Sequence, residues 1–269
     1  MKTLFLILLI KTSIFSQTLS FGAISTVDKS IMEKKLKPII SYISKTIKQP
    51  IKFQTGFDYL DTIEKFKLKK YDLGFIGPAP FLLAMQNTDK PLQIIVGLNT
   101  KNNGYFHSVI IVKNTSSIKS LEDLKGKSFA FGSPQSTLSY FMPMYLLKKQ
   151  NLDKKLSNIV FLGKHDRVAK YIIMGKYDAG GIKQSVANKY KKYIKIIAKT
   201  QDVPDFIIVA STNMPKQTVQ KIREALLKPE AQKLAKFIKP SATGFIKREE
   251  KDYDILKNIM LYVDKNSLK

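Results

Sequence analysis

The stretch between residues 132 and 140 carries three hydroxyl side chains where a strand is expected to pass into a helix. Its sequence, Gly-Ser-Pro-Gln-Ser-Thr-Leu-Ser-Tyr, places Ser136, Thr137 and Ser139 in the first turn of that helix. The backbone N–H groups at a helix start have no partner within the helix, and with the helix dipole and the hydroxyl donors they form a site for an anion. The alternative is that Ser136 or Thr137 only caps the helix.

A histidine stands at the start of the following expected helix. His165 lies in Leu-Gly-Lys-His-Asp-Arg, where an imidazole can donate to an oxyanion, although a lone histidine also serves purely structural roles. With no Cys and two His in the chain, a thiolate or histidine-rich metal site is excluded, and we predict no metal and no cofactor.

The residue types of a serine hydrolase are also present. Ser136, His165 and Asp205 provide a nucleophile, a base and an acid, but no Gly-x-Ser-x-Gly elbow surrounds Ser136. No Gly-rich loop ending in Lys-Ser or Lys-Thr exists either, so nucleotide hydrolysis is not supported. We therefore predict a binding protein and not an enzyme.

Two tyrosines lie beside expected strand ends. Tyr59 follows the strand that ends near Phe57, and Tyr105 precedes a strand that begins at Phe106. A phenol hydroxyl donates to an anion without adding charge. A core or surface position without any ligand is the alternative for each tyrosine.

Short apolar runs alternate with helical patterns along the chain, and these elements must position the polar residues. This alternation predicts an α/β protein with parallel sheets covered on both faces. Strands are expected over 19–25, 51–57, 71–76, 93–99, 106–112, 128–131, 159–162, 177–182, 194–198 and 206–210. Helices are expected over 30–48, 58–68, 81–86, 121–127, 136–150, 165–174 and 215–238, and the tail 249–263 is amphipathic.

One short sequence occurs twice in similar form. Lys-Tyr-Asp-Leu-Gly-Phe-Ile at 70–76 is matched by Lys-Tyr-Asp-Ala-Gly-Gly-Ile at 176–182. Two similar α/β halves, each with a loop at the carboxyl end of the strand, would hold a ligand between them. Chance similarity over seven residues is the alternative.

The formal net charge of +25 does not indicate a nucleic-acid partner. Only three of the 46 basic residues are Arg, and the lysines are scattered along the whole chain. Proteins that read nucleic acid depend on the planar guanidinium of Arg. We interpret the charge as a lysine bias with solvated faces, or as a field that attracts small anions.

The N-terminus has the pattern of a secretory signal. Met-Lys-Thr precedes the apolar run Leu4–Ile10, which is too short to cross a bilayer. We predict a signal peptide over residues 1–16 and a periplasmic location, with no cysteine available for a lipid anchor. A buried first strand is the alternative for this run.

Together these segments resemble the periplasmic substrate-binding proteins of phosphate, phosphite and phosphonate ABC transporters. The segments that carry the resemblance, in order, are Phe21–Thr26, Tyr71–Pro80, Gly104–Val112, Leu121–Lys127, Pro134–Thr137, Gly163–Asp166 and Tyr177–Gly180. The resemblance implies a type II periplasmic binding protein fold, with two α/β lobes, a hinge and a central ligand cleft. Residues 17–104 and 206–269 would form lobe 1, and residues 105–205 would form lobe 2.

The resemblance also implies a set of ligand-binding residues. Asp205 would accept a hydrogen bond from a protonated oxygen of the anion, and the others would donate to it. The full set is Tyr59, Tyr105, Ser136, Thr137, His165 and Asp205.

Two positions depart from the family pattern. Leu138 and Ser139 follow the Ser-Thr pair where the family often has Ser-Gly, which leaves the role of Ser139 open. Members that bind aminophosphonates have a carboxylate after the Asp-Ala-Gly strand, whereas this chain has Lys183. We infer a ligand without an ammonium group: phosphate, phosphite or a small alkylphosphonate.

The expected function is capture of this phosphorus oxyanion for an ABC importer. The partners would be the anion and an ABC permease in the inner membrane, and the protein would act as a monomer. The alternative is a binding protein that presents the anion to a membrane sensor kinase.

Overall fold

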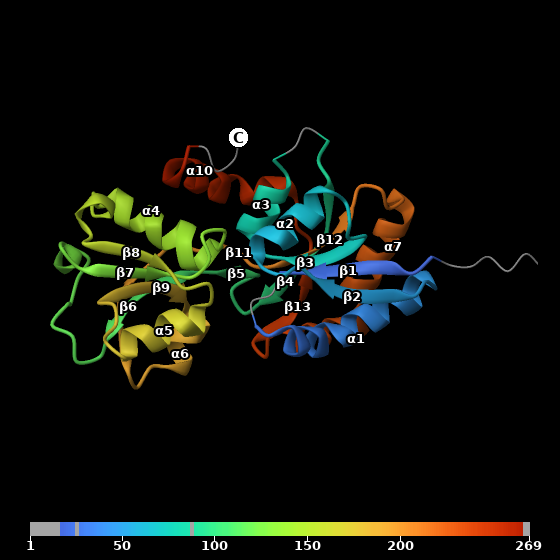
Figure 1. Ribbon diagram of the computed structural model, residues 1–269. Coiled ribbons are helices and arrows are strands. Elements are labelled where there is room, and N and C mark those ends of the chain that lie inside the picture. The colour runs from blue at the N-terminus through green and yellow to red at the C-terminus, as the bar shows by residue number, and fades with distance from the viewer. Residues whose placement is uncertain (1–16, 25–26, 87–88, 266–269) are drawn as a thin grey trace, which may run out of the picture.

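Two α/β lobes lie side by side in the computed structural model of the chain, each built on its own sheet (Figure 1). The structure describes residues 17–24, 27–86 and 89–265. The predicted signal peptide, residues 1–16, lies outside the described residues. Within the described part of the chain, no helix is both long and apolar enough to cross a membrane.

The first lobe has a six-stranded sheet in the order β13-β4-β12-β3-β1-β2. One face packs on α1 (Lys29–Ile47) and α7 (Lys216–Leu227), and the other on α2 (Tyr59–Lys67) and α3 (Pro78–Ala84). The strands are β1 (Leu19–Ala23), β2 (Ile51–Thr55), β3 (Leu73–Ile76), β4 (Leu92–Thr100), β12 (Ile207–Ser211) and β13 (Ala242–Ile246).

The second lobe has a five-stranded sheet in the order β10-β6-β9-β7-β8. One face packs on α4 (Met142–Lys149) and the other on α5 (His165–Ile173) and α6 (Gln184–Lys189). The strands are β6 (Ser108–Lys113), β7 (Ser128–Phe131), β8 (Asn158–Phe161), β9 (Ala179–Lys183) and β10 (Ile194–Lys199).

The predicted α/β class is confirmed, but the prediction of wholly parallel sheets is wrong. In the first lobe β1 runs parallel to β2 and β3, whereas β12 is antiparallel to β3 and β4. In the second lobe β6 is antiparallel to β9 and β10. The reason is the connection between the lobes. The strands β6 and β12 begin at this connection, so they run opposite to β4 and β10, which end at it.

Two short strands form the connection between the lobes. β5 (Tyr105–Phe106) and β11 (Val203–Pro204) pair antiparallel, with Tyr105 opposite Pro204. The predicted strand 106–112 is therefore split into β5 and β6, and β11 was not expected at all. A strand of two residues has no alternation that a sequence could display.

The predicted helix over 215–238 consists of three separate helices. α7 ends at Leu227 and is followed by α8 (Pro229–Gln232) and α9 (Ala235–Ile238). The break lies at Lys228, which is extended with ψ of 150° because it precedes Pro229. By contrast, α1 continues past Pro38 as one helix.

The helix α10 (Asp254–Val263) contacts both lobes. Its residues Leu256, Ile259 and Met260 pack in the same core cluster as α4 of the second lobe, while Tyr253, just before it, packs with α3 of the first lobe. Figure 1 shows α10 extending across the gap between α3 and α4. This helix is a third link between the lobes.

The repeated heptapeptide has an equivalent role in each lobe. Asp72 accepts hydrogen bonds from the backbone N–H and the hydroxyl of Ser20, both at 2.7 Å. Asp178 accepts the same two bonds from Ser128, at 2.9 and 2.7 Å. Each aspartate thereby joins the start of β3 or β9 to the neighbouring parallel strand, β1 or β7. The two similar sequences thus form the same Ser–Asp connection in each sheet.

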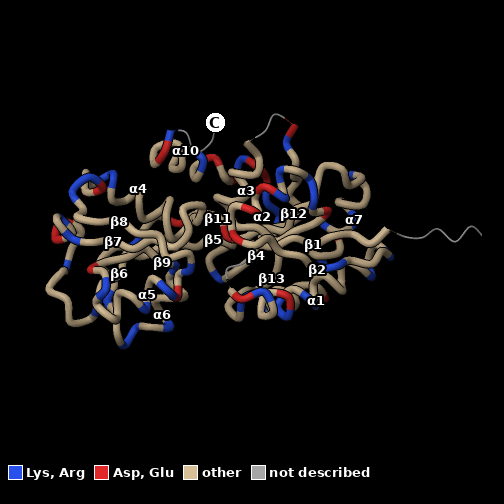
Figure 2. Tube along the Cα trace, viewed as in Figure 1, with Lys and Arg blue, Asp and Glu red and all other residues tan. Residues whose placement is uncertain are grey.

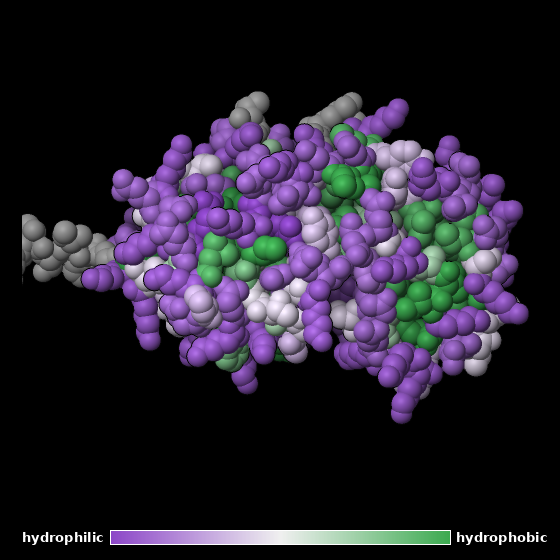
Figure 3. All heavy atoms as spheres, turned by 180° about the vertical axis from the view of Figure 1, so that it is seen from behind, coloured by the Kyte–Doolittle hydropathy of each residue, from purple (hydrophilic) through white to green (hydrophobic). Residues whose placement is uncertain are grey.

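Basic side chains are distributed over both lobes. Figure 2 shows Lys and Arg on many separate segments, interspersed with Asp and Glu, and they do not gather into one stripe. On the face in Figure 3, hydrophilic residues cover most of the surface and separate several hydrophobic patches. This distribution favours the interpretation of the charge as solvated lysine faces.

The Ser–Asp pairs should stabilise both lobes. We expect Ser20→Ala to lower the free energy of unfolding by about 1.5–3 kcal/mol, because it leaves a part-buried carboxylate without one of its donors. The loss in Ser128→Ala should be smaller, about 0.5–1.5 kcal/mol, because water can replace the donor of the exposed Asp178. Urea denaturation measures the loss. The control is Ser117→Ala at an exposed position, which should change stability by less than about 0.5 kcal/mol; equal effects at all three serines would contradict the assignment.

Candidate ligand-binding site

The predicted helix start at Ser136 is present, but its first turn is a π-helix. Residues Thr137–Phe141 form this turn, η2, which continues directly into α4. Ser136 caps the turn, since its Oγ accepts a hydrogen bond from the backbone N–H of Ser139 at 3.1 Å. Single π-turns of this kind occur frequently at functional sites. Ser136 and Thr137 are 4% and 5% exposed.

Ser139 is a structural residue. Its hydroxyl donates to the carbonyl of Gly181 and accepts from the backbone N–H of Gly132 at 2.7 Å. The residue is fully buried. Ser139 thus ties η2 to β9 and to the loop after β7, which answers the question that the sequence left open.

A small cavity of about 20 Å³ lies between the lobes, and both lobes form its walls. Tyr59, Gly77 and Pro80 come from the first lobe, and Ser136, Thr137, His165 and Lys183 come from the second. The structure therefore brings together four of the six residues that the sequence predicted: Tyr59, Ser136, Thr137 and His165.

Thr137 also joins the lobes directly. Its Oγ1 accepts a hydrogen bond from the backbone N–H of Ala79, in the first turn of α3, at 2.9 Å. At the rim of the cleft, Lys164 pairs with Asp28 of the first lobe at 2.7 Å. The lobes are therefore in direct polar contact beside the cavity.

The hydrogen bonds of His165 fix which ring nitrogen carries the proton. The backbone N–H of Lys183 donates to Nδ1 of His165 at 3.1 Å, so the hydrogen of the neutral ring is on Nε2. Burial, followed by the positive charge of Lys183, lowers the pKa of His165 to about 3. At neutral pH the residue is an uncharged imidazole with one N–H to donate.

Tyr59 is likewise an uncharged donor. It is the first residue of α2, after Asp58, whose carboxylate caps the helix by accepting from the backbone N–H of Asp61 at 2.8 Å. Burial raises the pKa of the Tyr59 hydroxyl above its usual range, so the phenol keeps its proton. The cavity therefore offers hydroxyl and imidazole donors.

Tyr105 and Asp205 lie in the wall of a second, larger cavity of about 580 Å³. Asp205 is 3% exposed and pairs with Lys239 at 2.7 Å, and the Arg248 guanidinium lies 4.6 Å from the ring centre of Tyr105. The sequence analysis expected all six residues in one site, but these two are placed at the hinge by β5 and by the residues after β11. Four residues form part of the wall of both cavities: Phe106, Leu138, Lys183 and Phe206.

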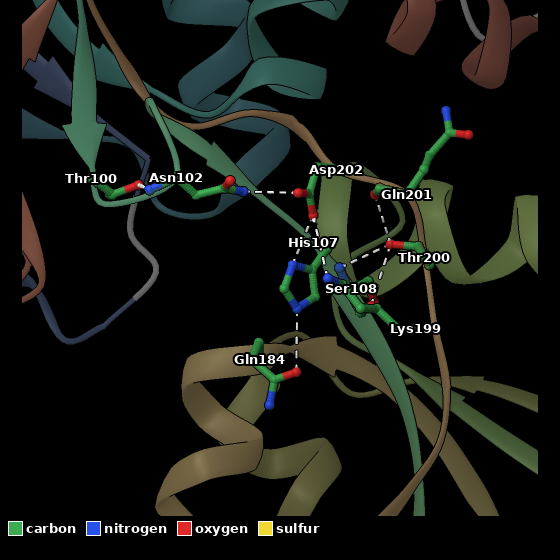
Figure 4. A network of polar contacts seen from close by, with 9 residues as sticks. All are labelled: Thr100, Asn102, His107, Ser108, Gln184, Lys199, Thr200, Gln201 and Asp202. Carbon is green, nitrogen blue, oxygen red and sulfur yellow. Dashed lines mark hydrogen bonds and ion pairs between the residues drawn. The ribbon is translucent and has the colours of Figure 1, made fainter.

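A polar network beside the hinge was not expected from the sequence (Figure 4). Asp202 accepts from the Asn102 amide at 2.8 Å and lies 2.9 Å from Nδ1 of His107, whose Nε2 is 3.2 Å from the Gln184 side chain. These residues come from the connections on both sides of the hinge and from α6. They form no local sequence motif, so only the fold brings them together.

No group of three or more His, Cys, Asp or Glu in the described residues is arranged to hold a metal ion. The small cavity between the lobes is lined by the hydroxyl residues Tyr59, Ser136 and Thr137 and by the imidazole of His165.

Comparison with known proteins identifies the family. A family model for the ABC transporter phosphonate periplasmic substrate-binding protein matches residues 21–253. The chain belongs to this family. Its members are periplasmic proteins of transport systems, as the sequence resemblance implied, and not a class of enzymes.

Two curated relatives have names that refer to phosphorus anions. The chain is 26% identical over 184 residues to a "Probable ABC transporter phosphite binding protein PhnD1" of Prochlorococcus marinus, across 63% of this chain and 59% of that protein. It is 27% identical over 176 residues to the "Phosphate-import protein PhnD" of Mycolicibacterium smegmatis, across 62% and 55%. The matches thus span less than two thirds of either relative.

The solved structures confirm the predicted fold class. PhnD1 of Prochlorococcus marinus, solved in complex with methylphosphonate, superimposes with a TM-score of 0.81 at 24% identity and covers 92% of this chain and 98% of that one. The chain therefore has the type II periplasmic binding protein fold, with two α/β lobes and a cleft between them.

The neutral state of His165 predicts a pH dependence of stability. The folded protein holds the pKa of His165 near 3, against 6.5 as the ordinary value, so protons bind more readily to the unfolded chain. The resulting contribution of His165 to the free energy of unfolding is complete above about pH 6.5 and is lost as the pH falls from there toward 3. We expect His165→Gln to lose less stability than the parent protein between pH 7 and pH 4.5 in urea denaturation.

The control for this measurement is Ser117→Ala, an exposed residue without a titratable side chain, which should retain the steeper pH dependence of the parent protein. If His165→Gln loses as much stability on acidification as the parent protein does, His165 is not held neutral by the fold.

Proposed function

We propose that this protein captures a small phosphorus oxyanion, namely phosphate, phosphite or an alkylphosphonate, and delivers it to the permease of an ABC importer. The observation that carries the proposal is the small cavity between the lobes, whose walls contain Tyr59, Ser136, Thr137 and His165. Each of these side chains is a neutral donor, so the site binds an anion by replacing its water shell with hydrogen bonds.

The energy of capture comes from a few charge-assisted hydrogen bonds. Each bond between a neutral donor and an ionised oxygen contributes about 1.5–3 kcal/mol when water is excluded. Ser136 keeps its hydroxyl hydrogen for the anion, because its oxygen accepts from the backbone of Ser139. The Nε2–H of His165 is available in the same way, because Nδ1 is occupied by Lys183.

Closure of the lobes couples binding to delivery. Donors from both lobes line the cavity, so an anion there stabilises the closed arrangement over an open one. The permease would recognise this closed form. A periplasmic location, which the predicted signal peptide and the family both favour, would bring the protein to the side of the inner membrane where such a permease takes up its substrate.

The relatives support a phosphorus oxyanion over other anions. Their names refer to phosphite, to phosphate import and, for the solved complex, to methylphosphonate. Tyr105 and Asp205 have a different part in this proposal from the one expected. They border the larger cavity beside the anion, where Asp205 is already paired with Lys239.

Removal of the neighbouring hydroxyls of Ser136 and Thr137 tests the proposed anion site. In the double variant Ser136→Ala, Thr137→Ala we expect the affinity for phosphite, phosphate or methylphosphonate to fall about 100-fold or more, since two charge-assisted bonds are lost. Isothermal titration calorimetry of the mature protein measures the change. Circular dichroism verifies that the variant is folded.

The control is Thr115→Ala, Ser117→Ala, which removes the same two hydroxyl types from an exposed segment of the second lobe and should leave affinity unchanged. An unaltered affinity in the Ser136, Thr137 variant would show that the anion binds elsewhere. A parent protein that binds none of the three anions would overturn the proposed function.

A further inference from the structure

Lys183 occupies a position that the proposed capture of a simple oxyanion does not require. It is the last residue of β9, and it borders both the small cavity and the larger one. Its backbone N–H orients His165, but that contact does not involve the ammonium group. The ammonium therefore needs a separate explanation.

The carboxylates closest to Lys183 in electrostatic terms are already paired with other groups. Asp205 accepts from Lys239 at 2.7 Å and from the backbone N–H of Phe206 at 2.8 Å. Asp166 accepts from Lys189 and from the hydroxyl of Tyr190, the latter at 2.9 Å. Among the described residues, no hydrogen bond or ion pair to the Lys183 ammonium is found.

The larger cavity has an excess of positive charge. Its walls include Lys35, Lys101, Lys183 and Lys239, against the single carboxylate of Asp205. Burial, followed by the charge of Lys239, lowers the pKa of Lys183, as expected for an ammonium that has lost water without gaining a partner. An anionic group beside Lys183 would relieve this cost, whereas a cationic group would increase it.

We infer that the ligand carries a second anionic group, a carboxylate on a short spacer from phosphorus, and that this group pairs with Lys183. The inference rests on the proposed function, since the phosphorus oxyanion must occupy the small cavity. The spacer is short because Lys183 borders the same cavity as Ser136, Thr137 and His165. The larger cavity, which shares the wall at Lys183, leaves room for the carboxylate. The ligand class is thus a short phosphonocarboxylate.

The test compares two nearly isosteric ligands, phosphonoacetate and phosphonoacetamide, which differ in the charge of the second group. We expect the parent protein to bind phosphonoacetate about 10- to 100-fold more tightly in calorimetry, the range of one charge-assisted bond. In Lys183→Met the preference for phosphonoacetate over phosphonoacetamide should fall to within about twofold, so that phosphonoacetate loses more affinity than methylphosphonate does. Aminoethylphosphonate should bind the parent protein more weakly than methylphosphonate.

The control is Lys125→Met, which removes an exposed lysine outside both cavities and should keep the full preference for phosphonoacetate. Equal affinity of the parent protein for the two ligands would overturn the inference. An equal loss for all phosphonates in Lys183→Met would also overturn it, because Lys183 would then contact the phosphoryl group. In both cases binding of methylphosphonate would leave the proposed function standing. If no phosphorus anion binds to the parent protein, the proposed function and the inference about Lys183 are both wrong.

Discussion

The pairing of β5 with β11 is the constraint on which the rest of the structure depends. These two short strands carry the chain from one sheet to the other and back. They are held by the backbone bond from Asp205 to Gly104, at 2.7 Å, and by Arg248, whose guanidinium donates to the carbonyls of Asn103 and Gly104. The strands that start at this connection run opposite to those that end there. The carboxyl ends of β3 and β9 therefore face each other across one cleft, with α3 and α6 beginning beside them.

This arrangement explains why the site holds neutral donors in a protein of net charge +25. The residues at the cleft come from strand ends and first helical turns, where hydroxyls and imidazole satisfy backbone groups of the same loops. Ser136 and Ser139 show this double use, because each hydroxyl oxygen accepts a backbone N–H. The lysines lie on solvated faces, where their long-range field can accelerate the approach of an anion without defining its binding site. Lys35, Lys101, Lys183 and Lys239 differ from them because they border the larger cavity, and Lys183 also borders the small one.

Much of this fold could be predicted from the sequence, because strands and helices with strong periodicity form where expected. The features that were missed depend on chain topology and not on local pattern: the direction of β6 and β12, the pairing of β13 with β4, and the packing of α10 against α4. The residues of the candidate site divide in the same way, into those that a local sequence motif marks and those that chain topology positions. Ser136, Thr137 and His165 stand in local motifs at helix starts, and the structure places them around one cavity with Tyr59. Tyr105 and Asp205 were expected beside them, but the hinge places these two in the adjacent cavity.

The contact between Thr137 and Ala79 shows how one hydroxyl can serve closure and binding together. Ala79 stands between Pro78 and Pro80, neither of which has a backbone N–H, so it is the residue of this segment that can donate to the other lobe. Its N–H binds Oγ1 of Thr137, and the hydroxyl hydrogen of Thr137 remains to be donated in turn. An anion that accepts this hydrogen polarises the hydroxyl and strengthens its bond to Ala79, since hydrogen bonds in a chain reinforce one another. If the anion binds as we propose, the same side chain would transmit its presence to the bond between Thr137 and Ala79, which joins the two lobes.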